Sequence, residues 1–190
     1  KPIIRAPDHS LYAVRIFNSS YLQLKDIEVV NTGSTILPTR TGVKLESSNY
    51  GTAHTLVLSG LDIRDVNGSL VKGEGGGSGI LIESRGDSIL SNFDALLIED
   101  CTIKRCQRNG MIWSANWNRY HRWFPSTNTI VRNNFIQGVP GDGIVPIACV
   151  NTLIEFNKMV DCPEILPQTE AAAGFWPWSC DNTTIQFNEV

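Results

Sequence analysis

Charge is scarce in this chain of 190 residues, of which only 18% are charged. The formal net charge is −3, with 16 Lys and Arg against 19 Asp and Glu. Such a balance argues against a nucleic-acid partner, which would require a basic face. No apolar run approaches the length of a membrane span, so we expect no membrane partner.

Motifs for several kinds of chemistry are also missing. The three histidines, His9, His54 and His121, are too scattered to suggest a metal site, and no CxxC or GxSxG motif occurs. The Gly-rich stretch from Gly73 to Gly79 lacks the Lys and the following helix of a phosphate loop, so it is better interpreted as a flexible connection. We therefore expect no metal and no cofactor.

A phrase with an Asn at a fixed place recurs along the chain, as TIVRNNFI from Thr129, TLIEFNKMV from Thr152 and TTIQFNEV from Thr183. A second frame starts at a Gly and reads GVKLES, GILIES, GMIWSA, GIVPIA and GFWPWS. Its glycines are 37, 31, 33 and 31 residues apart, which indicates a stacked-repeat architecture. The aliphatic positions of the first frame extend upstream as Leu24, Leu58, Ile98, Val131, Ile154 and Ile185.

Each repeat contains short segments of alternating apolar and polar residues, rich in Val, Ile, Leu and Thr, and none has a helical period. Such a unit cannot bury its apolar face alone and must stack on its copies as a solenoid of parallel sheets. The column that ends in Asn134, Asn157 and Asn188 predicts a turn where side-chain amides hydrogen-bond along the stack.

This pattern resembles the right-handed parallel β-helix superfamily, the pectate-lyase-like fold, which has an Asn ladder in one turn. The resemblance runs from about Ala13 to Val190 and is closest to secreted bacterial β-helix repeat proteins. It implies an all-β solenoid of about six coils, with residues 1–190 as a single domain. We expect the chain to be a piece of a longer solenoid, because no capping elements are visible. The superfamily hosts several activities, so the fold only narrows the function.

Two of the five cysteines, Cys149 and Cys180, each follow a repeat glycine by six residues and so occupy equivalent places on neighbouring coils. Equivalent residues on stacked strands lie about 4.8 Å apart, within the range that a disulfide allows. Stacked buried thiols are the interpretation we favour, and a Cys149–Cys180 disulfide remains the alternative.

The longest departure from the repeat, WSANWNRYHRWFPSTN from Trp113 to Asn128, combines aromatic and basic residues. Aromatic faces stack on sugar rings, while Arg and His bind carboxylates and hydroxyls. We predict a substrate-facing wall, with a flap packed on the solenoid as the alternative. The predicted substrate-binding residues here are Trp113, Asn116, Trp117, Arg119, Tyr120, Arg122 and Trp123.

A second departure is GFWPWSCDN, in which Trp176 and Trp178 should point outward. We predict that both bind substrate by lining a groove, unless a loop such as Pro163–Ala173 covers them. Asp142 lies in a turn between two glycines, which can bring the backbone close to a ligand, and Asp181 follows the Trp-rich strand.

Glu46 and Glu83 each follow a repeat glycine by four residues and should stack on neighbouring coils. Like charges so placed raise one pKa or attract a cation. A solvated pair moderated by Lys44 or Arg85 is the interpretation we favour over a catalytic one.

The leading hypothesis is a secreted, periplasmic or cell-surface carbohydrate-active enzyme that binds a polysaccharide or oligosaccharide. We predict a glycoside hydrolase with paired carboxylates, Asp142 and Asp181, and with His121 as a further catalytic residue. One alternative is a lyase in which Tyr120, His121, Arg119 and Arg122 act on a uronate. The other is a non-catalytic glycan-binding or structural module.

Overall fold

The computed structural model describes residues 1–163 and 170–190, which form seventeen strands in three parallel sheets and one short 3-10 helix, η1 (Lys72–Glu74). The all-β prediction with parallel sheets is therefore confirmed. None of the helical structure in these residues is long and apolar enough to cross a membrane. The first sheet has the order β1 (Ile3–Arg5), β4 (Glu28–Asn31), β7 (Asp62–Val66), β10 (Thr102–Cys106), β13 (Phe135–Gln137) and β16 (Lys158–Val160).

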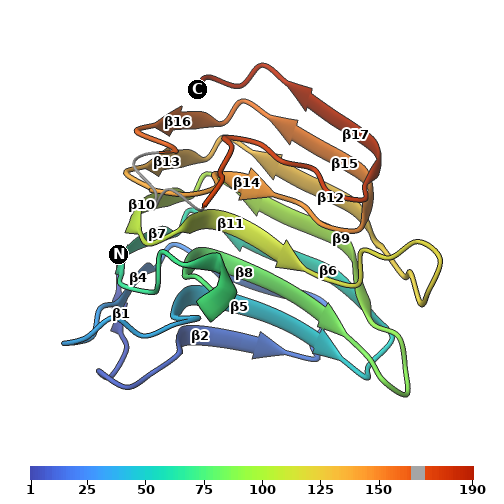
Figure 1. The fold of residues 1–190 in the computed structure, drawn as a ribbon, viewed down its shortest axis with the longest axis horizontal. Coiled ribbons are helices and arrows are strands. Elements are labelled where there is room, and N and C mark those ends of the chain that lie inside the picture. Colours follow the sequence, from blue (N-terminus) through green and yellow to red (C-terminus); the bar gives the residue numbers. More distant parts are fainter. Residues whose placement is uncertain (164–169) are drawn as a thin grey trace.

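The other two sheets are built in the same way, and Figure 1 shows the three sheets as sides of one stack. The second sheet has the order β14 (Ile144–Val145), β11 (Asn109–Ser114), β8 (Ser78–Arg85), β5 (Thr41–Ser48) and β2 (Tyr12–Phe17). The third has the order β17 (Asp181–Gln186), β15 (Cys149–Glu155), β12 (Ser126–Arg132), β9 (Asn92–Glu99), β6 (Thr52–Ser59) and β3 (Leu22–Lys25).

The chain passes through the second, third and first sheets in the same order throughout. One passage through all three sheets is called a coil. Each strand pairs with the equivalent strand of the next coil, so the repeat fixes the register. The aliphatic column is confirmed, since Leu24 pairs with Leu58 and Val131 pairs with both Ile98 and Ile154. The glycine frame is confirmed by the pairing of β5, β8, β11 and β14.

Alternation along the strands separates the core from the outer faces. In β5, Val43 and Leu45 are fully buried among the core residues, whereas Lys44 and Glu46 between and after them lie on the outer face. The core therefore runs along the axis of the stack, and the outward residues of each sheet decide what that face can do.

The predicted Asn ladder is present in the turn between the third and first sheets. The Asn134 side-chain amide donates to Asn157 Oδ1 at 2.9 Å, and that of Asn157 donates to Asn188 Oδ1 at 3.0 Å. Each Oδ1 also accepts a backbone N–H, so the polar groups of this buried turn are paired. The ladder is structural.

A second ladder, on the outside of the third sheet, was not predicted. Asn128, Asn151 and Asn182 all have φ near +50° and are joined by side-chain hydrogen bonds of 3.3 Å and 2.6 Å. Asn tolerates this left-handed conformation better than other residues with a side chain, which accounts for its recurrence.

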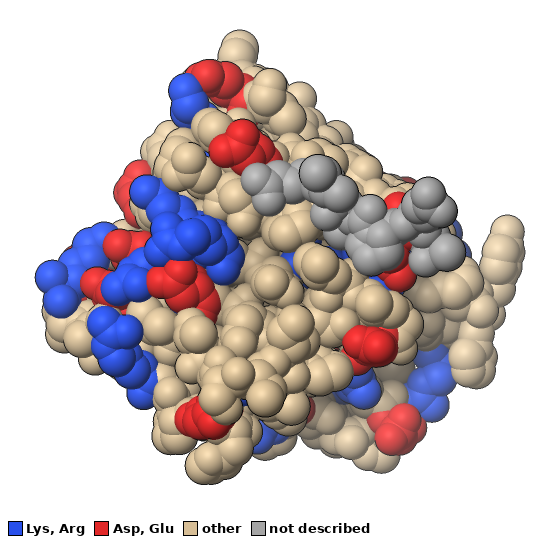
Figure 2. Space-filling model, turned by 60° about the vertical axis from the view of Figure 1, so that its left-hand side comes forward, with Lys and Arg blue, Asp and Glu red and all other residues tan. Residues whose placement is uncertain are grey.

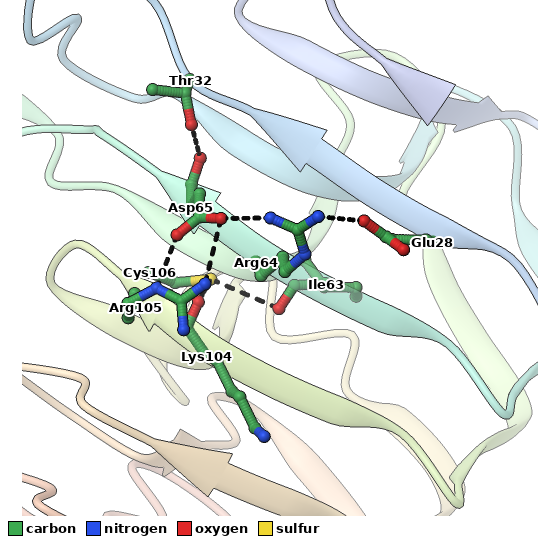
Figure 3. A network of polar contacts seen from close by, with 8 residues as sticks. All are labelled: Glu28, Thr32, Ile63, Arg64, Asp65, Lys104, Arg105 and Cys106. Atoms are coloured by element: carbon green, nitrogen blue, oxygen red, sulfur yellow. Dashed lines mark hydrogen bonds and ion pairs between the residues drawn. The ribbon is translucent and has the colours of Figure 1, made fainter. Parts of the chain in front are cut away.

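The outer face of the first sheet carries ion pairs (Figure 3). Arg64 bridges Glu28 and Asp65, and Arg105 donates to Asp65 at 2.6 Å from the next coil. Side chains of both signs gather in one part of the side that carries this sheet (Figure 2). Because Arg105 and Arg64 donate to the Asp65 carboxylate, the pKa of Asp65 is lowered despite partial burial.

Candidate functional site

An aliphatic column forms the floor of a cavity on the outer face of the second sheet. Leu81 pairs with Ile112, and Ile112 pairs with Val145, so the three lie side by side at outward positions. Outward positions on a strand with one wet face are ordinarily polar. Val145 is only 5% exposed, so neighbouring segments shelter this floor from solvent.

Tryptophans form a wall of this cavity. The rings of Trp176 and Trp178 lie 5.3 Å apart, and Trp117 packs edge-on against Trp178 at 6.0 Å. The Lys72 ammonium lies 5.1 Å from the Trp176 ring centre, a cation–π distance. Trp176 and Trp178 thus line the cavity, and their role in binding substrate stays a prediction. Of the alternative cover, Pro163–Ala173, residues 164–169 lie outside the described part.

Floor and wall enclose about 610 Å³, which is within the range of ligand sites. Two carboxylates, Asp142 and Glu83, line this cavity, together with polar residues of the loops that precede β5 and β8. They lie at opposite ends of it, because Asp142 precedes β14, whereas Glu83 is near the end of β8.

Asp142 is buried, with 3% of its surface exposed, at the corner where the chain enters the second sheet. The Ala173 N–H donates to its Oδ1 at 2.9 Å, and the Arg108 guanidinium lies 3.7 Å from its Oδ2. Burial nevertheless raises the pKa of Asp142 above its ordinary value, against these two favourable contacts. This carboxyl therefore keeps its proton to a higher pH than an ordinary aspartic acid does.

Arg108 connects three segments at this end of the cavity. It is 2% exposed and donates to the carbonyls of Leu70 at 2.9 Å and Ala171 at 3.2 Å. It also pairs with the Glu170 carboxylate at 2.9 Å, while Glu170 accepts the Lys72 N–H. The Gly-rich insertion and the segment that leads to Trp176 are thereby held against Asp142.

Glu83, at the opposite end of the cavity, belongs to the predicted Glu46–Glu83 stack, which the register confirms. Lys44 lies between the two carboxylates, 2.9 Å from Glu46 and 2.6 Å from Glu83, and Arg85 pairs with Glu83. Burial opposes ionisation of Glu46, but hydrogen bonds from Arg15 and Lys44 lower its pKa overall. The predicted moderation by Lys44 and Arg85 is present, but the expectation of a solvated pair was wrong, because Lys44 and Glu83 are buried.

The loop between β11 and β12 projects beyond the sheets (Figure 1) and returns to them through polar contacts. Arg119 holds both oxygens of Asp181, at 2.7 Å and 2.9 Å, and also lies over the Trp123 ring. This ion pair lowers the pKa of Asp181. Arg122 donates to the carbonyls of Gly86 and Asp87.

The predicted catalytic residues are not brought together. Asp181 begins β17 in the third sheet, where it pairs with Val150. Asp142 precedes β14 of the second sheet, so a corner of the coil separates the two carboxyl groups. Neither Asp181 nor the exposed His121 is among the residues that line the cavity with Asp142. An acid pair of Asp142 and Asp181 does not fit this placement.

The predicted wall residues divide into four groups. Trp117 lines the cavity, whereas Tyr120 is 99% exposed and Asn116 donates to the His121 carbonyl within the loop. Trp113 also borders the cavity, but its ring cannot face a substrate as predicted, because it lies at an inward position paired with Ile82 and is packed in the core with 1% exposed. Arg119, Arg122 and Trp123 hold the loop in place, so its base corresponds to the packed-flap alternative.

Sequence reasoning missed Arg108, Glu170 and Lys72. None of them stands in a motif, and their contacts join residues up to 98 positions apart. Lys72 and Glu170 were signalled only by the length of the insertions that carry them, whereas Arg108 lies in a two-residue turn between β10 and β11 that gave no signal. In the part of the chain that the structure describes, no group of three His, Cys, Asp or Glu side chains is arranged to hold a metal.

A stack of parallel strands with a tryptophan-lined cavity that holds charged groups of both signs on one outer face is an arrangement suited to carbohydrates. No protein-family model matches the chain. It is similar to a lacto-N-biosidase of Bifidobacterium longum subsp. longum, with 26% identity over 191 aligned residues. The match covers 80% of this chain but 12% of that enzyme, so the chain spans a small part of its relative.

Solved structures show the same fold. The GH136 lacto-N-biosidase of Eubacterium ramulus superposes with a TM-score of 0.73 and 23% identity, over 93% of this chain and 34% of that one. Its selenomethionine derivative gives a TM-score of 0.64 and 20% identity, over 93% of this chain and 38% of that one.

Proposed function

We propose that this chain is a segment of a right-handed parallel β-helix and belongs to a glycoside hydrolase that acts on an oligosaccharide. The observation that carries the proposal is the meeting of a tryptophan wall and a buried carboxyl, Asp142, in one cavity of suitable size. The similarity to lacto-N-biosidases supports the class of reaction. We further propose a bacterial enzyme that is secreted, periplasmic or displayed at the cell surface.

Asp142 fits the role of the general acid. A glycosidase acid must hold a proton near neutral pH and deliver it to the leaving oxygen. Burial favours the protonated form of Asp142, and its carboxyl lines the cavity in which the sugar would lie. The Ala173 N–H and Arg108 fix its orientation.

Glu170 is proposed as the second carboxylate because it shares Arg108 with Asp142, although Glu170 is not itself among the residues that line the cavity. It and Asp142 contact the two terminal nitrogens of one guanidinium, at 2.9 Å and 3.7 Å. Two carboxyl groups on one guanidinium lie within the separation, up to about 9.5 Å, that inverting glycosidases use. By register, Glu83 lies two coils away from Asp142 and five residues further along its strand. The two Cα atoms are therefore about 19 Å apart. Glu83 is too distant to pair with Asp142.

The test uses the whole protein that carries this chain and a chromogenic lacto-N-bioside, followed by a panel of other oligosaccharides and polysaccharides. We expect hydrolysis by the native protein and a loss of at least about 100-fold in kcat for Asp142→Asn and for Glu170→Gln. Glu83→Gln is the matched control, because it removes a cavity carboxylate outside the proposed pair, and its kcat should stay within a few-fold of the native value.

Product analysis separates the alternatives. A lyase leaves an unsaturated, ultraviolet-absorbing product, and it would require Arg119 and Arg122, which here pair with Asp181 and with backbone carbonyls. Sugar binding without turnover would identify a glycan-binding module and refute the hydrolase proposal. Turnover that survives Asp142→Asn would instead place the acid elsewhere in the protein.

A further inference from the structure

Cys149 and Cys180 occupy the same place on neighbouring coils, at the corner between the second and third sheets. Each directly precedes one member of the parallel pair Val150 and Asp181, and both are free thiols in the structure. Register neighbours of this kind lie about 4.8 Å apart between Cα atoms, inside the range that a disulfide spans.

The two thiols differ in environment. Cys149 is fully buried, whereas Cys180 is partly exposed at the margin of the core. The neighbouring Cys149 thiol lowers the pKa of Cys180 to about 7, outweighing burial, while Cys180 and burial both raise the pKa of Cys149. Cys180 is thus the member of the pair that supplies a thiolate near neutral pH.

Cys180 also lies within the segment that holds the cavity wall. Trp178, two residues earlier, is a wall residue and pairs with Ile147 across the coils. Ser179 donates to the Trp117 carbonyl at 2.8 Å, and Asp181 binds Arg119. A covalent bond at this position would fix the segment to the preceding coil beside two of the three wall tryptophans.

We propose that Cys149 and Cys180 form a modification site that closes to an intercoil disulfide by exchange with a small disulfide such as oxidised glutathione. The Cys180 thiolate attacks one sulfur of the reagent, giving a mixed disulfide and releasing one glutathione thiolate. Cys149 loses its proton and attacks the Cys180 sulfur, which releases the second. Two protein thiols are oxidised and one glutathione disulfide is reduced to two thiols. The cross-link itself does not depend on the proposed function.

The experiment treats the purified, reduced protein with oxidised glutathione, then blocks remaining thiols under denaturing conditions and maps peptides by mass. We expect one cross-linked peptide pair, Cys149 with Cys180, and an unfolding midpoint roughly 5 to 10 °C higher. Cys149→Ser should stop at a glutathione adduct on Cys180, whereas Cys180→Ser should form neither product.

Cys101→Ser is the matched control, because this thiol is 1% exposed in the core and burial raises its pKa to about 12. It should form the cross-link like the native protein. Retention of both thiols after treatment, or a cross-link that joins other cysteines, would overturn the proposal. If either serine variant fails to fold, the peptide map of the native protein decides alone.

Discussion

The outer faces of the first and second sheets have the same backbone and register but different outward side chains. On the first sheet, Arg105 pairs with Asp65 in solvent, with 59% of its side chain exposed. Arg108, three residues later at the entry to β11, is 2% exposed and pairs with Glu170 beside Asp142. The same kind of ion pair is exposed to solvent on the first sheet and enclosed on the second.

The difference arises from what covers each face. Among the described residues, nothing encloses Arg105 on the first sheet, so water screens its charge. The second sheet is sheltered by the Gly-rich insertion and by the segment that leads to Trp176, and its floor residues Leu81, Ile112 and Val145 are aliphatic. In a stack of similar coils, a site therefore forms where insertions enclose outward residues, and the strands supply only the frame.

The largest expected effect comes from Arg108→Met. The substitution leaves Asp142 and Glu170 without their shared cation and the Leu70 and Ala171 carbonyls without a donor. Breaking a buried ion pair from one side costs about 3–5 kcal/mol of unfolding free energy. Urea denaturation at pH 7, with constant slope, measures this loss.

Arg105→Met is the matched control on the open face, and we expect it to cost less than about 1 kcal/mol. Equal losses of unfolding free energy for Arg105→Met and Arg108→Met would show that enclosure does not strengthen the ion pairs of the second sheet.

The fold could be predicted from the sequence because it depends on local, repeated features. The aliphatic column and the Asn ladder appear at fixed spacing, and the structure has both. Only part of the site could be predicted from the sequence. Trp176 and Trp178 stand out because aromatic residues at outward positions are conspicuous, but Glu170 meets Arg108 across 62 positions, and no spacing rule reports such a contact. The Trp113 ring was expected in the wall because its segment is rich in aromatic residues. The alternation along the strand, which places Trp113 inward, was not taken into account.

The next largest effect concerns the wall. Removing the Trp178 ring takes away contacts to Trp117 and Trp176 and an aromatic face for a sugar. We expect Trp178→Ala to raise KM for the oligosaccharide about tenfold, about 1.4 kcal/mol, with a smaller change in kcat. Steady-state kinetics measure the split.

The control on the open face is Phe135→Ala, which removes an aromatic ring beside Lys104 on the first sheet. It should leave KM unchanged, and a similar rise in KM for both variants would mean that the wall has no particular role in binding.

The two faces should also respond to pH in opposite senses. The pKa of Asp142 is raised in the fold, so its ionisation destabilises the protein as pH rises above about 4, the unfolded value. Asp142→Asn removes this penalty and should gain stability relative to the native protein between pH 4 and 7. Thermal unfolding across this range tests it.

For Asp65 the pKa is lowered, so its stabilisation is present above about pH 4 and is lost as pH falls through the folded value. Asp65→Asn should therefore differ most from the native protein near neutrality and least in acid, always on the less stable side. Parallel pH profiles for the two Asn variants would contradict the contrast between the faces.

The smallest expected effect is the coupling between Arg105 and Asp65 themselves. A double-mutant cycle with Arg105→Ala and Asp65→Ala should give less than about 1 kcal/mol, because water and salt screen an exposed pair. At 1 M salt, where the screening length is about 3 Å, the coupling should fall further. The same cycle at Lys44 and Glu83, whose side chains are 7% and 8% exposed, should retain more of its coupling in salt. If salt weakens both couplings equally, the sheltered face is as accessible to ions as the open one.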